Sequence, residues 1–192
     1  MKFIIYDTRQ QEGKHANKHK QITDSGICLV KACMPCGDYC SFDGLSDETK
    51  KKVEELSFQY SLLKSLKKEP KPKLRKEVSD RLLNEIKISV DTKQDLEELS
   101  KNLMNRSDHS RFWKEVRKAK EHGIKLIILC EHGGQIKSIP DVEKWHSKYS
   151  PVSGRALMEE IYRVHISYGV DFVFCDKRRT GKKIIELLGG AL

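Results

Sequence analysis

The sequence has no apolar run that approaches the roughly 20 residues a helix needs to cross a bilayer. The hydrophobic stretch at its beginning, residues 3–6, is too short for the apolar core of a secretory signal peptide. The chain also has no internal repeat and no long low-complexity tract. These absences argue against a membrane-spanning chain, a secreted chain and a repeat array, and they predict a soluble protein of the cytoplasm.

Acidic residues are too few to balance the basic ones. The chain has 28 Asp and Glu against 37 Lys and Arg, so its formal net charge is +9. Such a charge favours polyanionic partners, with nucleic acid the first candidate, although many ordinary proteins are also basic. At 192 residues, with 38% hydrophobic and 34% charged residues, the chain is long enough for one domain with its own core.

The six cysteines do not require disulfides, because nothing points to secretion and a domain of this size builds a core without them. Four of the cysteines are closely spaced, namely Cys28, Cys33, Cys36 and Cys40. Two residues separate Cys33 from Cys36, which is the spacing of a zinc or iron–sulfur ligand pair. Cys28 and Cys33, however, fall at opposite parity on one predicted strand and would face opposite ways. Small buried side chains are the favoured interpretation of these cysteines, and a metal cluster is the alternative.

Short apolar runs bounded by turn residues predict strands at residues 3–6, 26–33, 39–42, 86–91, 124–130 and 171–175. Residues 11–20 predict a polar helix, and apolar residues spaced three and four apart predict helices through 96–103, 112–119, 157–168 and 184–188. The run 124–130 is so apolar that we expect it to be buried on both faces. Helices and strands alternate in the second half, which predicts an α/β fold layered around a mixed sheet.

Residues 45–85 differ from the rest of the chain in being rich in lysine and glutamate. Val53, Leu56, Tyr60 and Leu63 predict one amphipathic helix, and prolines at 70 and 72 end it before a second helix begins. We expect a helical hairpin inserted between two core strands, with a basic tip at Lys71, Lys73, Arg75 and Lys76. The hairpin is open to three interpretations: a DNA clamp, a dimer arm or a solvated surface excursion.

Charged residues follow or begin three of the predicted strands. Asp7 ends the first, Asp38 begins the third, and Asp91 and Lys93 lie at the end of the fourth, on one face because they are two residues apart. A hard divalent cation such as Mg²⁺ takes carboxylate oxygens, water and substrate phosphate as ligands, and a lysine places a positive charge near the attacking water. If these strands are neighbours, the pattern is typical of a metal-dependent nuclease.

These segments resemble those of a known family. The run 4–9, the Gly-Asp-Tyr triplet at 37–39, the acid-x-lysine strand, the helix that begins at 154–157 and the turn at 168–170 are similar to those of the XPF-type nuclease domain (excision-repair cross-complementation group four), a branch of the PD-(D/E)XK superfamily. The stand-alone versions found in phages and bacterial mobile elements are the most similar, since they share runs like 7–11, 13–15 and 90–93.

The resemblance implies a single nuclease domain over residues 1–192 with a restriction-endonuclease-like mixed sheet, in a bacterial or phage-infected cell. It implies Mg²⁺ or Mn²⁺ held by Asp38 and Asp91, with Lys93 and Asp7 completing the catalytic set. It further implies cleavage of branched DNA in repair or recombination. Thr92 and Gln10 depart from the family pattern, since they stand where arginine and glutamate are usual.

DNA contacts are expected from the basic segment that follows the first strand, namely Arg9, Lys14, His15, Lys18, His19 and Lys20. The family also includes partner subunits with degenerate sites, so a non-catalytic DNA-binding or partner subunit of the same fold is the alternative function. Related domains pair through their C-terminal helices, which makes a homodimer involving Leu157, Ile161 and Ile184 a further expectation, with plain core packing as the other interpretation.

Overall fold

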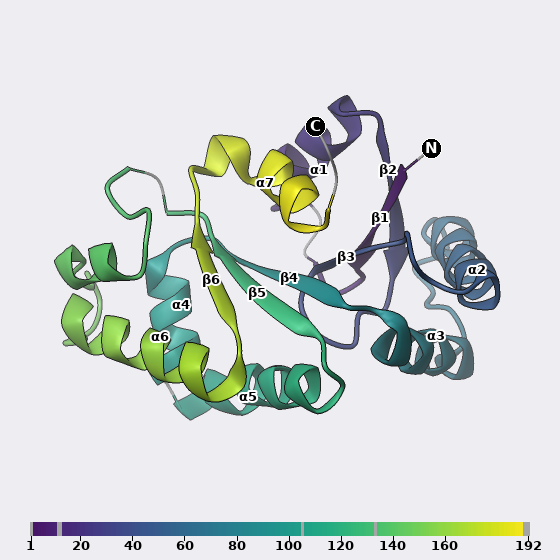
Figure 1. The fold of residues 1–192 in the computed structure, drawn as a ribbon. Coiled ribbons are helices and arrows are strands. Elements are labelled where there is room, and N and C mark those ends of the chain that lie inside the picture. The colour runs from purple at the N-terminus through teal and green to yellow at the C-terminus, as the bar shows by residue number, and fades with distance from the viewer. Residues whose placement is uncertain (1, 11–12, 105, 133, 190–192) are drawn as a thin grey trace.

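The computed structural model describes residues 2–10, 13–104, 106–132 and 134–189, and the side chains of residues 106–110 are outside that description. Its sheet has six strands in the order β2-β1-β3-β4-β5-β6 (Figure 1). Their bounds are β1 Lys2–Asp7, β2 Ile27–Ala32, β3 Tyr39–Ser41, β4 Ile88–Lys93, β5 Lys125–Cys130 and β6 Asp171–Phe174. All six predicted strands are therefore confirmed, with shifts of at most two residues at their ends.

The sheet is mixed because β3 alone runs against its neighbours. β1 pairs with β2 in parallel, β4 with β5 and β5 with β6 likewise, whereas β3 is antiparallel to both β1 and β4. Strand β5, which lies between β4 and the edge strand β6, has five buried residues out of six, as its unbroken apolar sequence predicts. The predicted α/β fold around a mixed sheet is confirmed.

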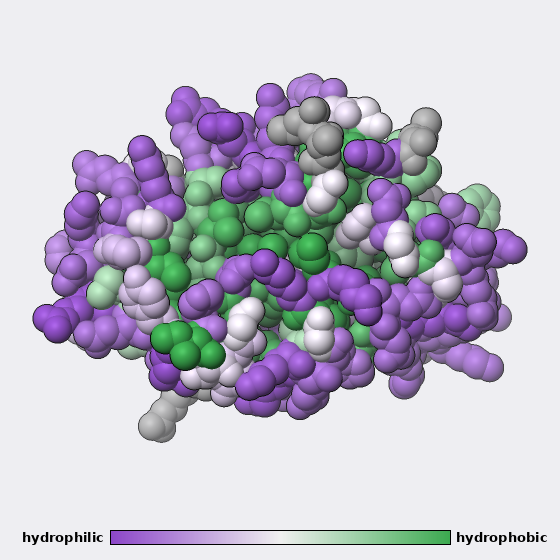
Figure 2. All heavy atoms as spheres, viewed as in Figure 1, coloured by the Kyte–Doolittle hydropathy of each residue, from purple (hydrophilic) through white to green (hydrophobic). Residues whose placement is uncertain are grey.

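Helices cover both faces of this sheet. The bounds are α1 Ala16–Asp24, α2 Asp47–Leu63, α3 Pro72–Glu85, α4 Leu96–Met104, α5 Arg106–Glu121, α6 Gly154–Tyr168 and α7 Thr180–Leu187, with short 3₁₀ turns at Pro140–Lys144 and Lys177–Arg179. Figure 1 shows α1 and α7 above the sheet, and α4, α5 and α6 below it. Figure 2 shows hydrophilic side chains over the outer helices and hydrophobic ones mainly in the middle of this view.

Two hydrophobic clusters correspond to the two faces. Tyr39 and Val90 belong to the cluster that also contains Ile22 of α1 and Ile184 of α7. Residues of α2 through α6 form the other, larger cluster. Because side chains alternate along a strand, the residues next to Tyr39 and Val90 point to the side of α4 and α5.

The segment 45–85 forms a helical hairpin, as predicted. Ser46 caps α2 by accepting a hydrogen bond from the Thr49 N–H, and Pro72 occupies the first turn of α3. Glu85 accepts hydrogen bonds from Ser46 and Thr49, which ties the end of α3 to the beginning of α2. The hairpin is not a free excursion, because its apolar rows pack into the larger core cluster; those rows are Val53, Leu56, Tyr60, Leu74, Val78 and Leu82.

Two glycines are required where elements approach closely. Gly37 has φ +65°, and a Cβ there would lie 2.4 Å from the Ser89 Oγ, so the turn into β3 admits no side chain. A Cβ on Gly181 would lie 2.6 Å from the Lys18 carbonyl oxygen, which shows how tightly α7 packs against α1. The first contact fixes the turn that precedes Asp38, and the second fixes the helix that carries Lys18.

Burial distinguishes between interpretations that the sequence left open. Leu157, Ile161 and Ile184 are completely buried within one chain, so they pack in the core and do not form a surface between copies. Cys36 and Cys40 are buried as well, and no group of three or more potential metal-binding side chains occurs among the described residues. In the described part of the chain, no helix is long and apolar enough to cross a membrane.

Candidate active site

Three neighbouring strands place the predicted acidic residues side by side. In the sheet, Tyr6 pairs with Tyr39 and Tyr39 pairs with Val90, so the residue after Tyr6, the one before Tyr39 and the one after Val90 lie in a row. The Asp7 N–H donates to the Asp38 carbonyl over 2.9 Å, and the Asp38 N–H donates to the Val90 carbonyl over 2.8 Å. The backbone thus holds Asp7, Asp38 and Asp91 adjacent to one another at one end of the sheet.

Asp7 is already held by partners in this arrangement. Its side chain is 3% exposed, pairs with the guanidinium of Arg9 and accepts a hydrogen bond of 3.2 Å from the Met34 N–H. Burial raises its pKa, while Arg9 opposes that rise. Arg9 also reaches Glu115 of α5 over 3.1 Å, so it connects the end of β1 to a helix distant in sequence.

Asp38 and Thr92 form the second contact of the row. One carboxylate oxygen of Asp38, Oδ2, accepts hydrogen bonds from the Thr92 hydroxyl over 2.5 Å and from the Thr92 N–H over 2.9 Å. Its other oxygen, Oδ1, has no hydrogen-bond partner within the described residues. That oxygen is therefore available for a ligand.

Asp91 and Lys93 form a buried ion pair. Their carboxylate and amine are 2.6 Å apart, and their side chains are 9% and 6% exposed. Burial raises the pKa of Asp91 above its ordinary value, although the lysine beside it favours the charged form. Burial alone would lower the pKa of Lys93, but the nearby Asp91 and Asp38 carboxylates outweigh it and hold that pKa above its ordinary value.

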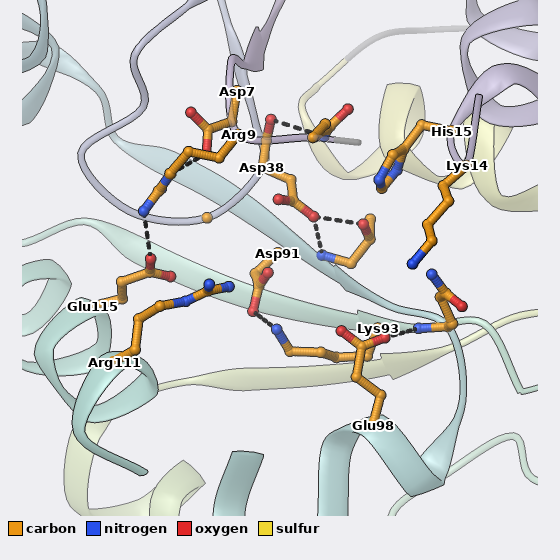
Figure 3. Close-up of a pocket in the computed structure, with 14 residues that line it drawn as sticks. Asp7, Arg9, Lys14, His15, Asp38, Asp91, Lys93, Glu98, Arg111 and Glu115 are labelled. Carbon is orange, nitrogen blue, oxygen red and sulfur yellow. Dashed lines mark hydrogen bonds and ion pairs between the residues drawn. The ribbon is translucent and has the colours of Figure 1, made fainter. Parts of the chain in front are cut away.

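These side chains line one hollow of about 220 Å³ between the end of the sheet and helices α4 and α5. Figure 3 shows Asp38, Asp91 and Lys93 directed towards one another across it, with Arg9, Lys14 and His15 at its edges. The structure thus brings together all four residues predicted as catalytic, and it places three of the six predicted DNA contacts beside them.

Three further charged residues of this hollow were not predicted from the sequence, namely Glu98 of α4 and Arg111 and Glu115 of α5. Glu98 accepts a hydrogen bond of 2.8 Å from the Gln94 N–H, so it fixes the turn that leaves β4. Its place in the first turn of the helix after β4 was a usable signal. Arg111 and Glu115 lie on a helix with many charged residues, and no local sequence pattern separates these two from the others.

The prediction that Lys18 contacts DNA is wrong, because this side chain is buried. It is 4% exposed, and its amine donates to the Thr92 hydroxyl over 3.2 Å and pairs with the buried carboxylate of Glu131. Thr92 thus lies between Lys18 and Asp38. A buried, paired lysine contributes to holding Asp38 in place and offers no charge to a phosphate at the surface.

The remaining basic candidates differ in position. Lys20 is exposed, pairs with Asp24 and does not line this hollow. His19 contacts Gln10 and Tyr39, each over 3.1 Å, and burial together with the neighbouring His15 lowers its pKa to about 4. His19 is therefore neutral near pH 7 and contributes no positive charge there.

The donor set suits a hard divalent cation. Asp38 Oδ1 and the carboxylate of Asp91 are oxygen donors at the centre of the hollow, and oxygen is the atom that Mg²⁺ and Mn²⁺ prefer. Because Asp91 is paired with Lys93, a cation and the Lys93 amine would compete for the same carboxylate. Asp7 is less available, since both of its oxygens have partners.

Of the comparisons with known proteins, only the one with solved structures gives a match. No protein-family model matches the sequence, and no curated protein matches it. Among solved structures, XPF from Aeropyrum pernix superposes with a TM-score of 0.55 at 14% sequence identity, over 97% of this chain and 59% of that one. The chain therefore has a restriction-endonuclease-like fold similar to that of XPF from Aeropyrum pernix, and it spans about three fifths of that protein's length.

Proposed function

We propose that this protein is a metal-dependent DNA endonuclease. The observation that carries the proposal is the convergence of Asp7, Asp38, Asp91 and Lys93, from three adjacent strands, around a single hollow. An XPF-like fold and a formal charge of +9 are consistent with it.

In this proposal Asp38 and Asp91 hold Mg²⁺ or Mn²⁺. The bound cation supplies Lewis-acid activation of the phosphate and of water. Lys93 would release Asp91, orient the attacking water and offset the negative charge that builds on the phosphate oxygens. The water oxygen bonds to phosphorus as the bridging P–O bond breaks, and the leaving oxygen takes up a proton as the water loses one. Asp7 fixes Arg9 at the rim, and Arg9, Lys14 and Arg111 contact the DNA backbone around the hollow.

The proposal includes selectivity for branched DNA and a place in the stand-alone phage and mobile-element branch of the XPF-type nucleases. These finer statements rest on the sequence resemblance alone, carried by the Asp-Thr-Arg run at 7–9 and the Val-Asp-Thr-Lys run at 90–93. In this proposal residues 1–192 form one nuclease domain, and residues 45–85 are an insertion within it.

A second candidate function is a DNA-binding or partner subunit without catalysis. It is supported by the fact that each carboxylate of the row already has a partner, Arg9 for Asp7, Thr92 for Asp38 and Lys93 for Asp91. In that case the ion pairs would be purely structural, and DNA binding would be salt-sensitive with no cleavage in any divalent metal.

A cleavage panel separates the two functions. Purified protein with Mg²⁺ or Mn²⁺ is incubated with single-stranded, duplex, flap and junction DNA, alongside Asp38→Asn and Lys93→Met. We expect the wild type to cut, branched substrates fastest, and both variants to lose at least a hundredfold in rate, which is a usual loss when one charge-stabilising group is removed.

Asp43→Asn is the matched control, because Asp43 is an exposed carboxylate outside the hollow. It should cut like the wild type, and thermal melting should show that every variant is folded. Cleavage by Asp38→Asn and Lys93→Met at the wild-type rate would remove these residues from the reaction. Binding of DNA with no cleavage of any substrate would favour the second candidate function.

A further inference from the structure

A second, larger hollow of about 630 Å³ lies beside the candidate active site. It opens over the free edge of the sheet at β2, between α1 on one side and the C-terminal half of α2 on the other. Ser57 of α2 accepts a hydrogen bond of 3.2 Å from the Lys31 N–H, which holds the helix against this edge. Gln10 and His15 line both hollows, so the two adjoin at these residues.

The lining of this second hollow, which we call the α2 groove, is strongly basic. Lys31, Lys67 and Lys68 line it, and among the described residues of its lining Glu69 is the one that is acidic. Glu69 already lies 3.5 Å from the guanidinium of Arg75, so its charge is partly used elsewhere. The excess of positive charge predicts an anionic occupant.

Lys67 stands in an unfavourable conformation at the mouth of this groove. It has φ +51° and is the only described residue other than glycine with a positive φ. Its N–H donates to the Lys64 carbonyl and the next N–H donates to the Leu63 carbonyl, so it occupies the helix-ending position at which glycine is the usual residue. A lysine here costs conformational energy that glycine would avoid, which is consistent with a use for its charge.

The size of the groove limits what enters. Its volume lies within the range of roughly 300 to 1,000 Å³ that is typical of small-molecule sites, which is room for one or two nucleotides of a single strand. Tyr6 and His19 add ring surface to its wall, and their ring centroids are 4.7 Å apart. Basic grooves with aromatic side chains are typical of sites that follow a single-stranded backbone.

We propose that the α2 groove binds a single-stranded DNA arm whose backbone continues into the active-site hollow across Gln10 and His15. The inference rests on the proposed nuclease function for the identity of the polymer. It assigns the α2–α3 hairpin a role in substrate selection, because a branched substrate would place its unpaired strand in the groove.

Binding without cleavage tests this proposal. Fluorescence anisotropy in EDTA is measured with a labelled 15-nucleotide single strand and with a 15-base-pair duplex. The variant Lys67→Gln/Lys68→Gln is compared with Lys51→Gln/Lys73→Gln, which removes two exposed lysines of the same hairpin that lie outside the groove. We expect the groove variant to bind the single strand about tenfold more weakly, with a salt slope lower by about 1.4, from 0.7 per phosphate contact.

A second variant separates binding from folding. Lys67→Gly removes the unfavourable φ, so its melting temperature should equal or exceed that of the wild type, while its single-strand affinity falls. Any of three results would overturn the proposal. The control variant could lose as much single-strand affinity as the groove variant, the groove variant could lose as much affinity for the duplex as for the single strand, or both Lys67 variants could bind the single strand like the wild type.

The failure of the groove and the failure of the proposed function give different results. If the groove lysines are needed for single-strand binding while no substrate is cut, the binding site in the groove is supported and the nuclease function is wrong. If DNA is cut and Lys93→Met abolishes cutting, but the groove variants bind and cut like the wild type, the nuclease stands and the groove is wrong.

Discussion

The hydroxyl of Thr92 donates a hydrogen bond of 2.5 Å to Asp38, and Lys18 donates one of 3.2 Å to the same hydroxyl. Thr92 therefore connects a buried ammonium on α1 to a proposed metal ligand at the start of β3.

Thr92→Val should slow cleavage about tenfold, because it removes one hydrogen bond worth roughly 1 to 1.5 kcal/mol and leaves the Asp38 carboxylate held only by the backbone N–H. The measurement is the single-turnover rate at several Mg²⁺ concentrations, which separates weaker metal binding from slower chemistry. Thr92→Ser keeps the hydroxyl and should restore most of the rate. Equal rates for Val and Ser would show that the hydroxyl is unimportant.

Lys18→Met should lower the free energy of unfolding by about 3 to 5 kcal/mol, because it leaves the Glu131 carboxylate buried without its charged partner. Urea unfolding at pH 7 measures this. Lys18→Met/Glu131→Leu removes both charges, and it should be more stable than the single variant. If Lys18→Met were as stable as the wild type and only DNA binding weakened, the buried pair would be the wrong account of this lysine.

Gly37→Ala should destabilise the protein more than Gly26→Ala does. Both positions have positive φ, which costs alanine about 1 to 2 kcal/mol, but only at Gly37 would the new Cβ meet an atom, the Ser89 Oγ at 2.4 Å. Thermal melting of the two variants isolates the crowding, because the backbone cost is shared. Equal losses at the two positions would mean that the turn before Asp38 adapts.

His19 should make stability fall as pH falls. Its folded pKa is about 4, lowered by burial, whereas an unfolded histidine titrates near 6.5. Between these values the unfolded chain binds more protons, so the stability due to a neutral His19 is present above about pH 6.5 and is lost towards pH 4. Urea unfolding at pH 7.5 and 5.0 should show a smaller difference for His19→Gln. An NMR titration that placed the His19 pKa at 6.5 would contradict this.

The strands and the acidic row could be predicted because they obey local rules. Each of Asp7, Asp38 and Asp91 adjoins a short apolar run, and the two-residue period of strands puts Asp91 and Lys93 on one face. What the sequence did not contain was the strand order that places β3 between β1 and β4.

Lys18 shows where such reasoning stops. It was grouped with the polar residues of its helix, but it lies four positions before the buried Ile22 and so shares that residue's inward face. Its partner Glu131 is 113 residues away, at the end of β5, and no local pattern reveals that pairing. The Arg9–Glu115 contact escaped prediction for the same reason.

Incubation with covalently closed circular single-stranded DNA tests the central claim most directly, because a circle has no ends and opens only by internal hydrolysis of a phosphodiester bond. We predict that the wild type linearises the circle with Mg²⁺ or Mn²⁺, that EDTA stops the reaction, and that folded Lys93→Met leaves the circle closed. A wild type that leaves every circle closed in both metals, or a Lys93→Met variant that opens circles as fast as the wild type, would contradict the account.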